Sequence, residues 1–313
     1  MIFCTVITEN YLPLAQVLHQ SLVQQQPGTR LIILVADRQE ATQKGNADLL
    51  GLNDLVNAPF FREIENKYAH SNKDVLRWAL KPVLLGHLLQ SGHEKVAYAD
   101  PDLFFTGDFN FIADLLNEAA VVLTPHWADL DLRRNDDSIF SILRNGIFNA
   151  GFVAAGRKGL PAIQWWAGMC HFKMEKKQEL GLYDDQRYLD LMQVQFKEVH
   201  VLRHQGCNLA AWNIHSCKRE MKDGRLLING QYNPVFIHFT HDTINNILEK
   251  NDEPLRPYLD EYMKLLTAKG FNLLGSTESD ATAFHNSWLY RIKHQLRLRT
   301  RIKNLLFRLA EKL

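Results

Sequence analysis

Stretches of strand length alternate with stretches of helical periodicity along the first hundred residues. Runs of mainly apolar and β-branched residues, typical of strands buried on both faces, occupy residues 2–8, 31–36 and 95–99. Between them, residues 12–25 and 75–89 carry apolar side chains at the three- and four-residue spacing of a helix. This strand–helix–strand order predicts a mostly parallel sheet covered by helices on both faces.

Beyond residue 120 the pattern is less regular. It predicts strands at residues 120–124, 148–154 and 233–239, and helices at residues 161–175, 184–192 and 254–269. Residues 127–137, rich in Asp and Arg, are expected to form an exposed loop, and residues 270–287 a linker.

The carboxyl ends of the predicted strands are the first places to look for a ligand site. Asp100 and Asp102 follow the strand at residues 95–99 and project from the same side of an extended backbone. Two carboxylates that close repel each other unless a positive charge lies between them, and a divalent cation with oxygen ligands supplies it. The alternative is a turn with two solvated acids.

Three further motifs carry polar groups at places where a ligand could bind. Residues 148–152 (Phe-Asn-Ala-Gly-Phe) set small residues between aromatic ones, which suggests either close approach of a ligand to the backbone or a glycine bulge. Asp184 begins a predicted helix and is explained as its N-cap, whereas Gln186 is not. His238 ends a late apolar strand, where it either joins the two aspartates on a metal or is structural.

Taken in order, these motifs resemble those of the retaining glycosyltransferases of family 8, which have the GT-A fold. The resemblance is strongest to bacterial members that add a sugar to lipopolysaccharide-type acceptors. It implies an α/β, GT-A-like architecture: a mixed, mostly parallel sheet with flanking helices and a C-terminal helical extension. The expected domains are a transferase domain at residues 1–245, an extension and linker at 246–287, and a basic tail at 288–313.

The resemblance also implies an activity. This activity is metal-dependent transfer of a hexose from a nucleotide sugar to a glycan or lipid-linked glycan, with retention of the anomeric configuration. UDP is the expected nucleotide, and cell-surface polysaccharide synthesis is the expected pathway. Asp100, Asp102 and His238 would bind Mn²⁺ or Mg²⁺. The expected donor-binding residues are Thr8, Asn10, Tyr11, Asp37, Arg77, Lys81, Asp100 and Gly151.

Catalytic and acceptor-binding residues follow from the same resemblance. Asn149 would touch the donor sugar, and Asp185 and Gln186 would lie near the anomeric carbon. Trp212 and Asn213 are expected to line the acceptor cleft, with a core tryptophan as the alternative for Trp212.

Two departures from the family pattern bear on the donor. Thr8 stands where the family commonly has an acid, which leaves the nucleotide base open. The residues from His238 onward, His-Phe-Thr-His-Asp, lack the Gly and Lys that often follow this histidine.

Charge is distributed unevenly along the chain. The 36 basic and 35 acidic residues give a net charge of +1, but residues 288–313 hold eight Lys or Arg and one Glu. This segment has apolar residues at helical spacing and predicts a cationic amphipathic helix. We expect it to bind the anionic inner face of the plasma membrane, placing the protein in the cytoplasm as a peripheral membrane protein. The alternative is a helix packed on the body or on another subunit.

Several protein classes are disfavoured. Four scattered cysteines without a Cys-x-x-Cys pair predict free thiols, and no secretory or membrane-spanning segment is expected. With Trp288 and Tyr290 as the only Trp or Tyr residues of the tail, no nucleic acid partner is expected. The alternatives to a glycosyltransferase are a sugar nucleotidyltransferase, which would need a glycine-rich phosphate loop, and a non-catalytic sugar-binding or membrane-adaptor protein of the same fold.

Overall fold

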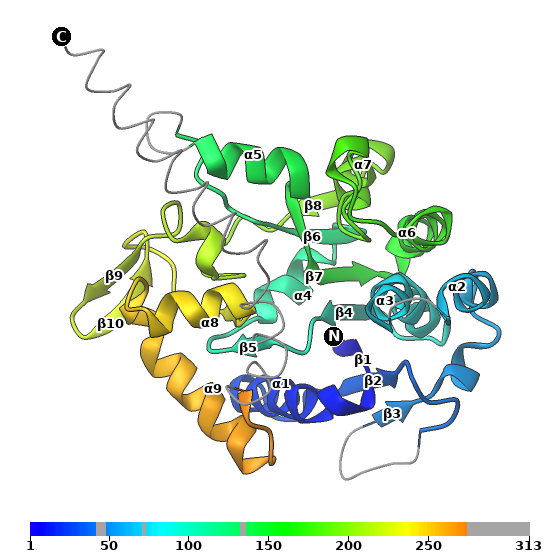
Figure 1. The fold of residues 1–313 in the computed structure, drawn as a ribbon, viewed down its shortest axis with the longest axis horizontal. Helices are drawn as coiled ribbons and strands as arrows, with labels where there is room; N and C mark the ends of the chain where they lie inside the picture. Colours follow the sequence, from blue (N-terminus) through cyan, green and yellow to red (C-terminus); the bar gives the residue numbers. More distant parts are fainter. Residues whose placement is uncertain (42–47, 71–72, 132–135, 274–313) are drawn as a thin grey trace, which may run out of the picture. The chain divides into compact units, whose positions relative to one another are not determined.

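A mixed sheet of seven strands organises the chain within the part that the computed structural model describes, residues 1–41, 48–70, 73–131 and 136–273 (Figure 1). Across the sheet the strands are β3 (Asp48–Leu50), β2 (Leu31–Val35), β1 (Ile2–Ile7), β4 (Lys95–Ala99), β7 (Phe148–Gly156), β6 (Val121–Pro125) and β8 (Val199–Val201). All neighbours are parallel except β7, which is antiparallel to both β4 and β6. The predicted mostly parallel α/β sheet is confirmed.

Helices flank the sheet because its central strands are apolar on both sides. The helices that pack on one face are α2 (Phe61–Tyr68), α3 (Lys73–Gln90), α6 (Leu160–Phe172) and α7 (Tyr188–Gln195). The elements on the other face are α1 (Leu12–Gln25), α4 (Asn110–Leu115) and the antiparallel pair of β5 (Leu103–Phe105) and β11 (Phe236–His238). Along β1, Cys4 and Val6 join the first core, and Phe3 and Ile7 join the second.

The remaining elements surround this framework. They are α5 (Asp136–Asn145), α8 (His241–Leu248), α9 (Arg256–Ala268) and the hairpin of β9 (Arg219–Lys222) and β10 (Arg225–Ile228). Short 3₁₀ turns occupy Glu9–Tyr11, Leu52–Leu55, Arg157–Gly159, Gln178–Leu180, Ala211–Asn213 and Glu253–Leu255.

The chain divides into two units, Met1–Tyr262 and Met263–Leu313. Only residues 263–273 of the second unit are described. The predicted domain boundaries at residues 245 and 287 therefore stay predictions. The proposed membrane-binding tail, residues 288–313, and most of the predicted linker, residues 270–287, lie outside the described residues.

Most predicted elements agree with the structure, but three differ. The helix predicted at residues 184–192 begins at Tyr188, because Asp184 adopts a positive φ of 44° and its carboxylate pairs with Lys176 instead of capping a helix. The late strand is shorter than predicted, at Phe236–His238. The loop predicted at residues 127–137 is half-buried at residues 127–129, and α5 begins at its end.

The hydrophobic pattern missed several short elements. These are β3, β5, β8, β9, β10, α2, α4, α8 and most of α5. All but α5 are at most eight residues long, too short for a clear periodicity.

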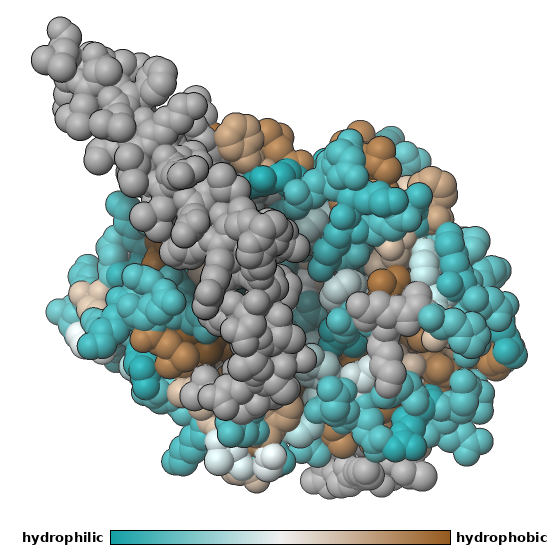
Figure 2. Space-filling model, in the orientation of Figure 1, coloured by the Kyte–Doolittle hydropathy of each residue, from teal (hydrophilic) through white to brown (hydrophobic). Residues whose placement is uncertain are grey.

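The surface is mainly hydrophilic in the view of Figure 2, with apolar side chains gathered where α5 lies. Phe140 and Leu143 of α5 are 54% and 64% exposed. All four cysteines are buried and free, as predicted. Among the described residues, no helix combines the length and the apolar character needed to cross a bilayer.

A bulge in β7 interrupts its pairing with β6. Leu123 of β6 pairs with Val153, but the next residue, Thr124, pairs with Asn149. Residues 150–152 are therefore displaced from the β6 ladder, and the Gly151 carbonyl accepts a hydrogen bond from the Asp100 N–H (2.8 Å). Bulges of this kind often lie beside active sites, where they re-aim side chains.

Candidate functional site

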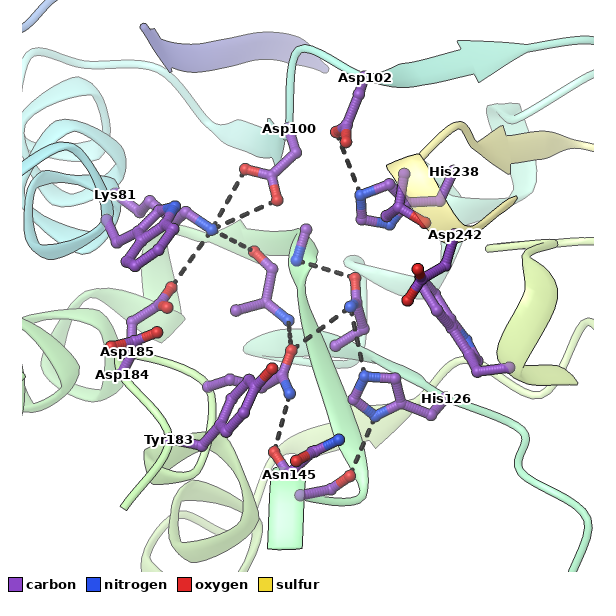
Figure 3. Close-up of a pocket in the computed structure, with 18 of the residues that line it drawn as sticks. Lys81, Asp100, Asp102, His126, Asn145, Tyr183, Asp184, Asp185, His238 and Asp242 are labelled. Atoms are coloured by element: carbon purple, nitrogen blue, oxygen red, sulfur yellow. Dashed lines mark hydrogen bonds and ion pairs between the residues drawn. The ribbon is translucent and has the colours of Figure 1, made fainter. Parts of the chain in front are cut away.

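Asp100, Asp102 and His238 meet at the carboxyl end of β4 (Figure 3). The two aspartates lie between β4 and β5, and β5 pairs with β11 so that His238 is opposite Leu103. This register brings His238 Nε2 to 3.1 Å from Asp102 Oδ1. One potential ligand atom from each of the three side chains lies within 4.8 Å of the others, so the predicted trio is assembled.

The environment of His238 suits a cation. Its Nδ1 lies 3.2 Å from Asn208 Oδ1, which can only accept a hydrogen bond, so Nδ1 carries a proton. In a neutral imidazole, Nε2 then turns its lone pair toward the Asp102 carboxylate, and a proton or a metal ion between them removes the repulsion. Burial lowers the pKa of His238, but the Asp102 and Asp100 carboxylates together outweigh burial and raise that pKa above its usual value.

Gly151 has no side chain, and this lets the cluster of Asp100, Asp102 and His238 pack against its backbone. A Cβ atom at Gly151 would lie 2.6 Å from His238 Cε1, 2.6 Å from Asn149 Oδ1 and 3.0 Å from Asp100 Oδ2. The bulge therefore packs bare backbone against the potential ligands. Two carboxylates and an imidazole form a donor set that suits Mn²⁺ or Mg²⁺, so these residues fit the expected metal.

Lys81 of α3 is a buried cation beside the acids. Its Nζ lies 3.1 Å from Asp100 Oδ1 and 3.4 Å from Asp185 Oδ2, and its side chain is 4% exposed. Tyr98 donates a hydrogen bond to Asp100 Oδ1 (2.6 Å). Although burial lowers the pKa of Lys81, the two carboxylates outweigh it and raise the pKa above its usual value. Burial raises the pKa of Asp185 to about 6, against the lowering effect of Lys81.

A chain of hydrogen bonds fixes Asn149 and Gln186. The Ala150 N–H donates to Gln186 Oε1 (3.2 Å), and Gln186 Nε2 donates to the Asn145 carbonyl (2.8 Å). Asn149 Nδ2 contacts both Gln186 Oε1 (3.4 Å) and His126 Nε2 (3.3 Å). Because His126 Nδ1 bonds the main chain, Nε2 is the acceptor in this arrangement. Both amides are thus held in one orientation.

These groups line one cavity of about 640 Å³, within the size range of small-molecule sites. The predicted site residues that line it are Tyr11, Arg77, Lys81, Asp100, Asp102, Asn149, Gly151, Asp185, Gln186, Trp212 and His238. The Arg77 guanidinium lies over the Tyr11 ring, 4.9 Å from its centroid.

Four predicted site residues do not line this cavity. Thr8 donates to Asn10 (2.5 Å), and Asp37 accepts from the Glu9 N–H (2.9 Å). They lie at the expected sheet edge, outside the cavity lining. Asn213 is fully buried, and its amide bonds the main chain of the same loop, so its side chain does not face an acceptor.

Sequence reasoning missed other lining residues. Among them are Trp78, His126, Asn145, Lys176 and Asp242. His126 follows β6 and could have been found by the rule that strand ends carry ligand sites. No sequence signal pointed to the others, because the packing of separate helices, and of the loop that carries Lys176, brings them to the cavity.

Two proteins of Bacillus subtilis are similar to this chain in sequence. No family model matches the chain. YfnD of Bacillus subtilis strain 168, an uncharacterized protein, is 36% identical over 174 residues, 53% of this chain. The chain thus spans about half (53%) of the length of YfnD. YfnF of the same organism, also uncharacterized, is 27% identical over 254 residues, covering 79% of this chain and 83% of YfnF.

Two solved glycosyltransferase structures resemble the fold. The galactosyltransferase LgtC in complex with donor and acceptor sugar analogs is 15% identical, with a TM-score of 0.48, covering 86% of this chain and 96% of LgtC. Mouse xyloside xylosyltransferase 1 is 14% identical, with a TM-score of 0.47, covering 77% of this chain and 98% of its own. At these scores, function has to be argued from the site itself.

Proposed function

We propose that this protein is a metal-dependent glycosyltransferase that moves a hexose from a nucleotide sugar to a glycan acceptor with retention. The observation that carries the proposal is the cluster of Asp100, Asp102 and His238, with ligand atoms within 4.8 Å, inside a cavity of about 640 Å³. Asp100, Asp102 and His238 would hold Mn²⁺ or Mg²⁺, which when bound neutralises negative charge on a diphosphate leaving group.

The protein's own charges prepare the cavity for such a donor. Lys81 balances the carboxylates of the half-buried Asp100 and the buried Asp185, so these acids do not repel a negatively charged ligand with their full charge. Arg77 lines the same cavity and is a second cation there, with its guanidinium also paired to Asp74 (3.0 Å). Both support the donor-binding roles that the resemblance implies.

The amide groups support a retaining reaction without a covalent intermediate. Gln186 is a neutral amide held at both ends, which suits orientation and stabilisation of a cationic sugar more than nucleophilic attack. The bond from the anomeric carbon to the phosphate oxygen breaks as the acceptor oxygen bonds on the same face. The acceptor's proton passes to the departing phosphate, so the products are the glycosylated acceptor and the nucleoside diphosphate.

The finer assignments rest on the sequence resemblance. They are a UDP-linked donor, a glycan or lipid-linked acceptor near Trp212, a place in cell-surface polysaccharide synthesis, and a peripheral position on the cytoplasmic face of the plasma membrane through residues 288–313. Trp212 lines the cavity beside His126 and His238, which supports stacking of an acceptor sugar there.

A thermal-shift screen of nucleotide sugars with and without Mn²⁺ tests the proposal. A ligand that binds the native state at 100 times its Kd stabilises it by about 2.7 kcal/mol, and we expect such a shift only with Mn²⁺ present. Donor hydrolysis with Mn²⁺ then separates an enzyme from a sugar-binding protein. If no nucleotide sugar shifts the melting temperature under either condition, the proposal is wrong.

A further inference from the structure

The second ring nitrogen of His238, Nδ1, contacts Asn208, a residue outside the metal cluster. Asn208 Oδ1 lies 3.2 Å from His238 Nδ1, and the two residues are 0% and 4% exposed. We propose that Asn208 is a positioning residue, which holds the Nδ1 proton of His238 so that Nε2 keeps its lone pair toward the cation site. The inference rests on the metal site of the proposed function.

The orientation of the Asn208 amide is determined by its other contacts. Nδ2 lies 3.4 Å from the Pro125 carbonyl oxygen, which can only accept. Oδ1 must therefore be the atom that faces His238. With Nδ1 occupied as a donor, Nε2 is the ring atom left to bind a metal, 3.1 Å from Asp102 Oδ1.

The main chain of Asn208 is held in place by its surroundings. The Asn208 carbonyl accepts a hydrogen bond from Asn213 Nδ2 (2.7 Å). The next residue, Leu209, donates from its N–H to the Phe236 carbonyl (3.1 Å) and accepts from the His238 N–H (2.9 Å). The loop that carries Asn208 is thus hydrogen-bonded to the backbone of the ligand it orients.

Asn208 also has a backbone conformation that only some residues tolerate. Its φ is +62°, in the left-handed region that favours glycine and, less strongly, asparagine. A purely local turn role would explain the asparagine without reference to His238. Asn229 offers a comparison: its φ is +51°, and its side chain hydrogen-bonds Lys218, Ser216 and Gln205 instead of a potential metal ligand.

The two roles are separated by measuring Mn²⁺ binding alone by calorimetry on the full chain. Asn208→Gly removes the side chain while keeping a residue that accepts a positive φ, and we expect Mn²⁺ affinity to fall about 10–100-fold. Asn208→Asp keeps an acceptor for Nδ1, so affinity should fall less than in Asn208→Gly. Asn229→Gly is the matched control and should leave affinity unchanged. Equal affinity of the wild type and Asn208→Gly would overturn the inference.

A second measurement is independent of metal. The hydrogen-bonded Nδ1–H of His238 should give a slowly exchanging, downfield proton resonance in the metal-free protein. Its loss in His238→Gln identifies the residue, and the ¹⁵N couplings to the ring protons distinguish Nδ1–H from an Nε2–H that faces Asp102. We expect this resonance to be absent in Asn208→Gly and present in Asn229→Gly, with both variants folded by circular dichroism. Persistence in Asn208→Gly overturns the inference. If the wild type binds no Mn²⁺, the metal site of the proposed function fails, and the resonance still decides whether Asn208 positions the ring.

Discussion

At the scale of single residues, Gly151 is the most sensitive position of the site. A methyl group there would lie 2.6 Å from His238 Cε1 and 3.0 Å from Asp100 Oδ2, both too close without movement of the ligands. We expect Gly151→Ala to fold but to weaken Mn²⁺ binding at least tenfold, about 1.4 kcal/mol. Calorimetry with Mn²⁺ measures this directly.

Gly86 provides the matched control. A Cβ at Gly86 in α3 would meet Ile163 at an ordinary 3.6 Å, and a helical Gly→Ala change favours the helix by up to about 1 kcal/mol. Gly86→Ala should leave Mn²⁺ affinity unchanged. If Gly151→Ala behaves the same way, the backbone at residue 151 does not shape the metal site.

Asp102 belongs to the same scale. We expect Asp102→Asn to abolish donor turnover while leaving the melting temperature within a few degrees, because the change removes a ligand charge without changing side-chain volume. Asp114→Asn, at an exposed position of α4, controls for general loss of charge. Full turnover in Asp102→Asn, or in the wild type with excess chelator, would contradict the metal site.

His126 makes stability depend on pH. Burial lowers the pKa of His126 from 6.5 to about 4, so the unfolded chain binds a proton at a higher pH than the folded protein does. Its stabilising contribution is full above pH 6.5 and is lost as the pH falls through 4. The shift corresponds to about 3 kcal/mol.

The measurement is urea unfolding at several pH values. Between pH 7 and pH 4, the free energy of unfolding of the wild type should fall by up to about 3 kcal/mol more than that of His126→Asn. Groups common to both proteins cancel in this comparison. Parallel pH profiles would show that His126 is not held neutral.

At the scale of elements, a buried ion pair stabilises the loop that carries Asn208. Arg219 Nε lies 3.2 Å from Asp252 Oδ2, and both side chains are 2% exposed. The same guanidinium donates to the carbonyls of Ala210 (3.0 Å) and Asn213 (3.1 Å). The β9 strand is thereby tied to the loop at residues 210–217.

Breaking this pair should be costly. We expect Arg219→Met to destabilise the protein by about 3–5 kcal/mol, because it leaves Asp252 buried without a partner. In a double-mutant cycle with Asp252→Asn, the coupling should exceed about 1 kcal/mol. The exposed pair of Arg256 and Asp260 in α9 is the control and should couple by about 0.3–0.5 kcal/mol. Similar coupling in both pairs would contradict the special role of the buried one.

At the scale of the whole molecule, the sequence predicts membrane binding through residues 288–313. Each basic residue near an anionic leaflet contributes about 1 kcal/mol, screened by salt. A chain truncated before Trp288 should no longer float with anionic vesicles in a flotation assay. It should still turn over a soluble acceptor. Neutral vesicles and high salt are the controls. Unchanged binding of the truncated chain to anionic vesicles would remove the membrane hypothesis.

The sequence alone determined the order of strands and helices and the main site motifs. Long apolar runs and three- to four-residue periodicity depend on local burial, so they can be read without coordinates. Asp100 and Asp102 were found because two close carboxylates follow a buried strand. Gln186 was found because helix capping explains Asp184 but does not explain Gln186.

Only the tertiary structure decided how these groups meet. The three-residue bulge of β7, the pairing of β5 with β11 and the positive φ of Asn208 arise from contacts between segments up to a hundred or more residues apart. Asn213 is turned inward by hydrogen bonds to the main chain of its own loop, and the helix after Asp184 starts late because Asp184 adopts a positive φ and pairs with Lys176. Such arrangements depend on packing and hydrogen bonding across the fold, which have no period along the chain.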